Sequence, residues 1–417
     1  MNIVELRRDL HANPEVGFTE FRTATRVVEE LRRLGYKVLF GDEVMRPSSR
    51  RGVPSVEQLT VAYERAKAEG ANEEILAAME GGLTGVVATL EGGGAGPTVA
   101  FRFDMDALPI VESHAADHLP QAEGFRSRHE GSMHACGHDG HTAIGLAFAE
   151  TMTHVNFNGT LKLIFQPAEE GGRGAVSMVD KGVVDDVDKL FCFHLGLDLP
   201  IGSMSGGATD FLASTKLEVR FKGVPAHAAA APEKGKNALL GAATALLNIH
   251  ALPRFSTGAT RVNVGILEGG SAPNIVPDSA KMVLECRAAS YEDNQDLERR
   301  VRSILEHSAE MHGLDCDIAV IGEAATAACD RELVELAMRE AKEIPFFTEQ
   351  LESHPLGASE DATFLMRRVQ EQEGQATYMI IGTTIAAPHH NEKFDIDERI
   401  LPMAVQLLER IARQTLR

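Results

Sequence analysis

The hydrophobic pattern changes at about Thr209, and this change constrains the fold more than any other feature of the chain. Before it, apolar strand-like runs alternate with helical segments. From Ser214 to Ile321 the order becomes strand, helix, strand, strand, helix, strand. This is the order of a ferredoxin-like unit, and roughly 115 residues is a usual size for a domain. The sequence therefore predicts an inserted α+β domain at 209–323.

The segments on either side, 1–208 and 324–417, are expected to form one α/β domain that the insert interrupts. Between Thr142 and Asp198, helical and strand-like runs alternate, which favours a largely parallel sheet covered by helices. The run Thr377–Gly382 returns to this pattern after the insert. Motif residues follow several of the strands, and open α/β sheets place their sites at the carboxyl ends of strands.

Charge, hydrophobic runs and cysteine content argue against nucleic acid or lipid partners, a membrane helix, a secretory signal and a disulfide framework. Of 417 residues, 41 are Lys or Arg and 61 are Asp or Glu, a formal net charge of −20. A uniformly acidic surface repels nucleic acid and anionic lipid, so neither is expected as a partner. No apolar run approaches the roughly 18 residues of a membrane helix, and the N-terminus lacks the apolar core of a secretory signal. The five scattered cysteines indicate reduced thiols in the cytoplasm.

The strongest local signal is the segment HACGHDGH at 134–141, which holds three histidines, a cysteine and an aspartate. Thiolate and imidazole are strong ligands for zinc and other first-row divalent ions. In an extended segment, Cys136 and His138 would point the same way. A catalytic Cys–His pair is the alternative, but Cys136 has no nucleophile turn around it. We therefore interpret the segment as part of a metal site.

Two adjacent carboxylates, Glu169 and Glu170, follow the apolar strand Leu161–Ile164. At such a position one carboxylate can bind a metal while its neighbour takes a proton from water. Paired glutamates are more often a solvated helix start. Their place between a buried strand and two glycines favours the functional interpretation.

Three weaker signals lie further along the chain. His194 ends a hydrophobic strand, and His389 and His390 lie in a loop before the last helix. Either could complete a metal site, although a structural histidine and a polar surface loop are the alternatives. In the insert, Arg287 at a strand end could bind a carboxylate with its planar guanidinium.

Seven segments in this order resemble a known family, and the resemblance extends from LRRDLHANPE near the N-terminus to the last helix. The segments are RFDMDALP (102–109), HACGHDGH (134–141), QPAEEG (166–171), FHLG (193–196), GVPAHAA (223–229), PNIVPD (273–278) and HHNEKFDIDE (389–398). The chain resembles amidohydrolases of the co-catalytic metallopeptidase group, which includes aminoacylases, hippurate hydrolases, auxin-conjugate hydrolases and glutamate carboxypeptidases.

The resemblance implies a phosphorylase/hydrolase-like catalytic domain that binds two divalent ions, manganese or zinc. The implied metal ligands are Cys136, His138, Glu170, His194 and His390. His390 is preferred to His389 because it stands four residues before Phe394, as the ligand histidine of the family does. Glu169 would be the general base and later the proton donor. Asp106 would orient the ligands, and Asp104 is a second candidate for that role.

For the inserted domain, the resemblance implies a lid that also mediates dimerisation. His227, Asn274 and Arg287 would bind the scissile carbonyl and the substrate carboxylate, and His227 could serve the active site of a partner chain. Ser271 and Ala272 depart from the glycine-rich or polar pair expected before Pro273, which leaves the fine substrate specificity open.

Four segments resemble one branch of the family, the hydrolases of p-aminobenzoyl-glutamate, a folate breakdown product. They are the insertion 45–82, AAAAPEKGKNALL (228–240), GATRVNVG (258–265) and GQATYMIIGT (374–383). The alternatives are a general aminoacylase of the hippurate type and a non-catalytic regulatory subunit. Such a regulatory chain would have no need of five ligands and Glu169. The expected partner is a second copy of the chain or a related B-type subunit.

Overall fold

The computed structural model describes residues 2–417, which divide into two compact units. The first unit comprises residues 2–209, Ala327–Leu356 and Asp361–Arg417. The second comprises Asp210–Thr326 and Gly357–Glu360. The second unit includes the short return segment Gly357–Glu360, which the hydrophobic pattern does not indicate.

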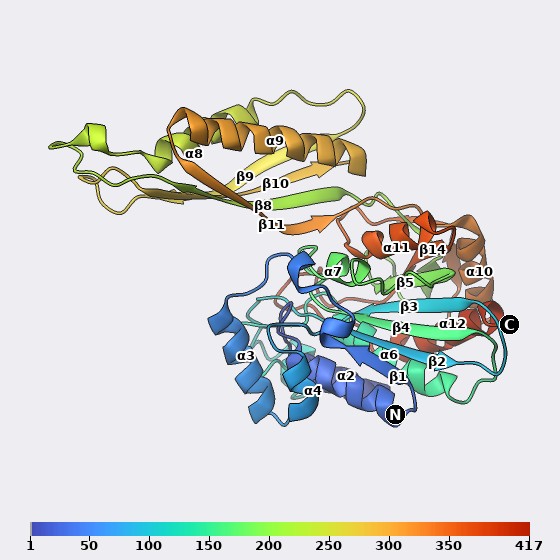
Figure 1. The fold of residues 1–417 in the computed structure, drawn as a ribbon. Helices are drawn as coiled ribbons and strands as arrows, with labels where there is room; N and C mark the ends of the chain where they lie inside the picture. Colours follow the sequence, from blue (N-terminus) through green and yellow to red (C-terminus); the bar gives the residue numbers. More distant parts are fainter. Residues whose placement is uncertain (1) are drawn as a thin grey trace. The chain divides into compact units, whose positions relative to one another are not determined.

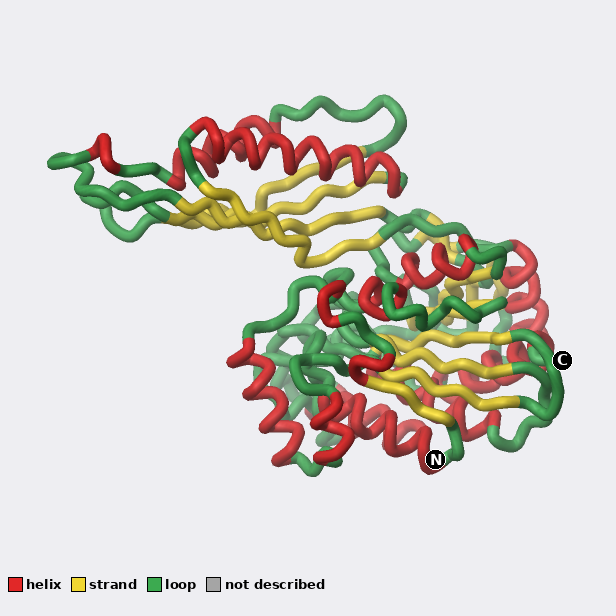
Figure 2. The backbone as a smooth tube through the Cα atoms, viewed as in Figure 1, coloured by secondary structure: helices red, strands yellow, loops and turns green. Residues whose placement is uncertain are grey.

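The first unit is built on an eight-stranded mixed sheet with the strand order β1-β2-β4-β3-β5-β14-β6-β12 (Figures 1 and 2). The strands are β1 (Lys37–Phe40), β2 (Val86–Glu91), β3 (Thr98–Asp104), β4 (Thr160–Gln166), β5 (Lys189–Leu195), β6 (Ser203–Ser205), β12 (Glu349–Leu351) and β14 (Gln375–Ile381). The four central strands, β4-β3-β5-β14, are all parallel. A separate short pair joins β7 (Ala208–Thr209) to β13 (His354–Pro355).

Helices cover both faces of this sheet. Its central strands are apolar, so both of their faces are buried under these helices. The helices are α1 (Ile3–Ala12), α2 (Phe21–Arg33), α5 (Leu119–Ala122), α6 (His138–Met152), α7 (Ala175–Val179), α10 (Arg331–Lys342), α11 (Ala362–Glu371) and α12 (Ile400–Thr415). Helix α6 packs on β3 and β4 together with α1, α2 and α12, whereas α11 packs on β5 and β14 together with α7. None of the described helices has the length and apolar character needed to cross a membrane.

Residues 45–82 form two helices, α3 (Val56–Ala68) and α4 (Glu73–Ala78). Both helices pack on α2, and Leu59 and Leu76 are buried. The loop before α3 is hydrogen-bonded to Arg173, just after the paired glutamates. Arg51 N donates to Arg173 O at 3.3 Å, and Arg173 Nη1 donates to Gly52 O at 3.4 Å.

The second unit is a four-stranded antiparallel sheet with the order β11-β8-β10-β9. Its strands are β8 (Ala213–Lys222), β9 (Thr260–Gly269), β10 (Ser279–Ala288) and β11 (Asp315–Ala324), and its helices are α8 (Ala238–His250) and α9 (Tyr291–Met311). Both helices lie on one face of the sheet (Figure 1). Met282, Leu284 and Cys286 of β10 are buried in this core, so the alternate residues, including Glu285 and Arg287, lie on the open face.

Candidate metal centre and catalytic site

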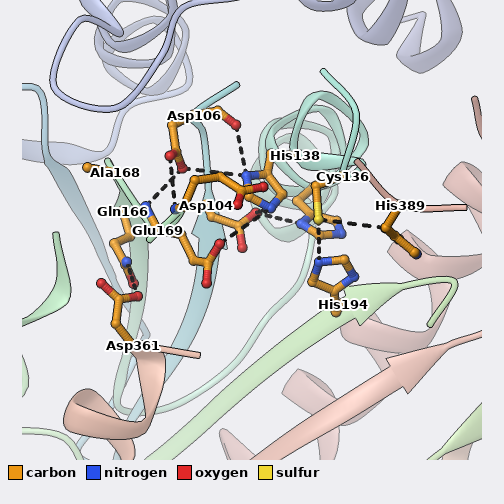
Figure 3. A network of polar contacts seen from close by, with 12 residues as sticks. Asp104, Asp106, Cys136, His138, Gln166, Ala168, Glu169, His194, Asp361 and His389 are labelled. Carbon is orange, nitrogen blue, oxygen red and sulfur yellow. Dashed lines mark hydrogen bonds and ion pairs between the residues drawn. The ribbon is translucent and has the colours of Figure 1, made fainter. Parts of the chain in front are cut away.

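The five expected ligands lie together at the carboxyl edge of the first sheet. They form two overlapping groups that could hold a metal ion, Cys136–His138–His194 and Cys136–Glu170–His390. Cys136 Sγ is 3.4 Å from His194 Nε2, and His390 Nε2 is 3.3 Å from Glu170 Oε1. Figure 3 shows Cys136 between His138 and His194. Because Cys136 belongs to both groups, the arrangement suits two neighbouring ions.

A single glycine lets Cys136 and His138 reach the same place. Gly137 is the N-cap of α6 and has φ 97°, a left-handed conformation. Glycine adopts this conformation readily because it has no Cβ atom, whereas other residues rarely do. Cys136 therefore ends a loop, and His138 opens the helix. Burial and the Glu170 carboxylate raise the pKa of Cys136. A bound divalent cation would reverse this shift, since coordinating thiols are deprotonated.

The tautomers of two histidines follow from their hydrogen bonds. His138 Nδ1 donates to Asp106 O at 2.8 Å, and His194 Nδ1 donates to Leu195 O at 2.8 Å. The Nε2 atom of each ring therefore carries a lone pair available for a metal, the usual arrangement in metal sites.

Among residues 2–417, the buried His138 Nε2 has no hydrogen-bond partner, and the buried Glu170 Oε1 has only the ion pair with His390 Nε2 at 3.3 Å. Buried polar atoms are rarely left in this state. Together with the set of thiolate, imidazole and carboxylate donors, they fit a site for divalent cations.

Asp106 orients the paired glutamates through their backbone. Its Oδ1 accepts from Glu169 N at 2.9 Å, and its Oδ2 accepts from Glu170 N at 3.0 Å. Its main-chain oxygen also binds His138. Asp106 thus contacts His138 and both glutamates, and Figure 3 shows it beside His138 and Glu169.

Glu20 also holds this turn, although nothing in the sequence singles it out. Ala168, next to Glu169, has φ 51°, a left-handed conformation rare for alanine. Its N donates to Glu20 Oε1 at 2.9 Å, while Thr84 Oγ1 donates to Glu20 Oε2 at 2.7 Å. Burial and the Asp106 charge raise the pKa of Glu20 to about 8. In the sequence, Glu20 resembles any polar residue at the start of a helix.

Asp104 and His141 adjoin the five expected ligands, and with His138 they form a further group that could hold an ion. His141 Nδ1 donates to Asp104 Oδ1 at 2.5 Å, and His141 Nε2 accepts from Leu195 N at 3.0 Å. Both ring nitrogens are therefore used, and they fix the backbone beside His194. Although burial opposes it, the neighbouring His138, His141 and Arg102 side chains hold the pKa of Asp104 well below its usual range.

The two remaining histidines of the motifs take different positions. His389 Nδ1 is 3.6 Å from Cys136 Sγ, but its Nε2 accepts from Leu197 N at 3.2 Å. His134 is buried, and burial lowers its pKa to about 4. Neither belongs to a group that could hold an ion among the described residues, whereas the neighbouring His390 does.

A buried arginine connects the two segments that carry Cys136, His138 and His390. Arg7 Nε donates to Asp139 Oδ2 at 2.7 Å, and Arg7 Nη2 donates to Asp395 Oδ1 at 2.7 Å. Asp139 follows His138, and Asp395 lies in the loop that carries His390. The sequence motif near the N-terminus contains Arg7, but only the folded structure indicates this role.

In the second unit, His227 and Asn274 lie side by side, and Arg287 lies elsewhere. Ala228 N donates to Asn274 O at 3.0 Å, and His227 pairs with Ile275 in an isolated bridge. Both segments adjoin the Ser279 end of β10. Arg287 lies eight residues further along this strand, about 26 Å away at a rise of roughly 3.3 Å per residue.

Comparison with known proteins places these features in a family context. The sequence model described as Peptidase family M20/M25/M40 matches residues 100–414. The chain is 47% identical over 410 residues to one of the subunits of p-aminobenzoyl-glutamate hydrolase from Escherichia coli (strain K12), covering 97% of this chain and 94% of that protein. It is 44% identical, with the same coverage, to indole-3-acetyl-aspartic acid hydrolase of Enterobacter agglomerans.

Two solved structures extend the comparison. An aminobenzoyl-glutamate utilization protein from Klebsiella pneumoniae has a TM-score of 0.86 and 40% identity, covering 99% of this chain and 95% of that one. A dinuclear metal binding peptidase of the M20 family from Bacillus subtilis has a TM-score of 0.66 and 25% identity, covering 99% of this chain and 97% of that one.

Proposed function

The chain belongs to peptidase family M20/M25/M40, a family of metal-dependent amidohydrolases, and we propose that it hydrolyses p-aminobenzoyl-glutamate to p-aminobenzoate and glutamate. The observation that carries the proposal is the pair of ligand groups that share Cys136, with Glu169 next to the ligand Glu170. The five free cysteines accord with a reducing cytoplasm, where we propose that the reaction takes place.

We propose that two ions, manganese or zinc, are held by Cys136, His138, Glu170, His194 and His390. When bound, such ions supply Lewis acidity, which polarises an amide carbonyl and makes water more acidic. Glu169 takes the proton of the attacking water and later delivers it to the leaving nitrogen. Its carboxylate is suited to this because Asp106 fixes its backbone and Oε2 lies 3.9 Å from His138 Nε2.

For the second unit, we propose that Arg287 binds the α-carboxylate and that His227 and Asn274 bind the scissile carbonyl. A small substrate cannot touch both ends of β10, because about 26 Å separate Arg287 from Ser279. We therefore infer that His227 and Asn274 complete the site of a second chain, so that this unit mediates dimerisation. That chain is another copy or a related B-type subunit, and the Escherichia coli relative is likewise named as one subunit of its hydrolase.

This arrangement predicts complementation between two inactive variants. Glu169→Gln lacks the base and His227→Ala lacks the residue donated to the partner, so each homodimer should be inactive. A mixed dimer has one site with both residues intact, and mixing the two variants should restore part of the activity. Absence of recovery, with exchange between dimers demonstrated by labelled chains, would show that His227 does not act across a dimer.

The substrate assignment predicts that a free α-carboxylate is required. p-Aminobenzoyl and benzoyl conjugates of Glu, Asp, Gly and Leu should be cleaved as acids, and their α-carboxamides should be cleaved at least about tenfold more slowly, because the charged hydrogen bonds to Arg287 are lost. The purified chain alone is assayed for metal content and turnover. Equal rates for acids and amides would show that Arg287 does not bind the α-carboxylate. A preference for apolar conjugates would indicate a general aminoacylase. A chain that binds metal without turnover would be the regulatory subunit.

A further inference from the structure

We propose that Arg261 binds the second carboxylate of the substrate and so makes the enzyme selective for conjugates of dicarboxylic amino acids. The inference rests on the proposed function, in which Arg287 binds the α-carboxylate. It adds a specificity-determining residue on the neighbouring strand.

The strand register places the two arginines opposite each other. In the pairing of β9 with β10, Arg261 is the direct partner of Arg287. Directly opposite residues of antiparallel strands have Cβ atoms about 4.5–5.5 Å apart and lie on the same face of the sheet. The two guanidinium groups can therefore reach a single small ligand.

Both arginines lie on the face that the helices leave open. Val262 and Val264 of β9 pack against the helical core, so Arg261 and Asn263 point the other way. On β10, Cys286 is buried in that core, whereas the side chain of Arg287 is 38% exposed. A ligand on the open face would meet both guanidinium groups.

The charges around this pair are unbalanced. Arg287 Nε lies 2.9 Å from Glu285 Oε2, but Arg261 has no carboxylate within 4.0 Å among the described residues and donates only to Thr260 O. Like charges directly opposite on a sheet are destabilising. In a chain with a net charge of −20, an arginine without a carboxylate beside a second arginine favours an anionic ligand.

The chemistry of the ligand follows from this spacing. Glutamate and aspartate carry two carboxylates joined by a short chain, which suits two guanidinium groups on adjacent strands. Both are named in relatives of the chain, one as a p-aminobenzoyl conjugate and the other as an indole-3-acetyl conjugate. The acyl groups differ, and the shared feature is the second carboxylate. Arg287 would bind the α-carboxylate and Arg261 the side-chain carboxylate.

The test compares p-aminobenzoyl-glutamate with p-aminobenzoyl-glutamine, which has the same shape and a neutral side chain. Arg261→Gln should lower kcat/KM for the glutamate conjugate at least about tenfold, the loss expected for a charged hydrogen bond, and change that of the glutamine conjugate less than about threefold. Arg261→Lys should keep part of the preference, because it keeps the charge but not the planar fork.

The matched control is Lys281→Gln, which removes one positive charge from the open face of the same sheet, at the other end of β10. It should leave both rates unchanged, and the thermal midpoint of all variants should match that of the wild type. Equal loss on both substrates, or no loss on either, in Arg261→Gln would overturn the proposal. Failure of the proposed function is distinguishable, since the wild-type enzyme would then cleave neither conjugate.

Discussion

Glu169→Gln should lower kcat by roughly a hundredfold or more while both metal ions stay bound, because glutamine cannot take a proton from water. The substitution keeps the size of the side chain, and the backbone N–H that Asp106 binds is unaffected. Turnover is measured under saturating substrate, and metal content is measured on the same samples. Because substrate binding does not depend on the proton transfer, KM should change far less than kcat.

The matched control is Glu123→Gln, which removes an exposed carboxylate that pairs with Arg8 and belongs to none of the groups that could hold an ion among the described residues. Its kcat should equal that of the wild type. Turnover of Glu169→Gln within a few fold of the wild type would show that another group is the base. Loss of metal together with activity would instead place Glu169 among the ligands.

Cys136→Ser should weaken binding of both ions, because Cys136 is the residue that the two ligand groups share. Altering partners of metal ligands already costs roughly 10–100-fold in affinity, so loss of a ligand should cost about a hundredfold or more. Replacing a soft thiolate by a hydroxyl should also shift the preference from zinc towards manganese. Metal affinity is measured by competition with a chelator, which requires no assay of activity.

The stability of this variant gives a second readout. Metal raises the thermal midpoint of a protein that binds it only when folded, so added zinc should raise the midpoint of the wild type more than that of Cys136→Ser. Cys316→Ser is the matched control, since Cys316 is a half-buried residue of β11 in the second unit. Equal stabilisation of all three proteins by zinc would show that Cys136 is not a ligand.

The order of the elements, and the meeting of Glu169, Glu170 and His194 at one edge of the sheet, could be predicted from the amino-acid sequence alone. The reason is local: Glu169, Glu170 and His194 each follow or end a buried apolar strand, and parallel strands bring their carboxyl ends to one edge of the sheet. Only the resemblance to the family favours His390 over His389, because the ligand histidine of the family stands four residues before the phenylalanine that corresponds to Phe394. In the structure, His390 lies beside Glu170, and His389 accepts a hydrogen bond from Leu197.

The residues that hold the candidate metal centre in place, and the residue beside Arg287, became apparent only in the folded chain. Glu20 and Ala168 are hydrogen-bonded although 148 positions separate them in the sequence, and Arg7 and Asp395 are 388 positions apart. The hydrophobic periodicity of the sequence does not indicate such long-range contacts. The pairing of Arg261 with Arg287 depends on the register between β9 and β10, and this register shifts between Val283 and Leu284. Shifting that register by one residue would turn Arg261 to the opposite face, so the alternation within each strand could not reveal the pair. Long-range packing, and not local preference, therefore sets the support of the metal centre and the surroundings of Arg287.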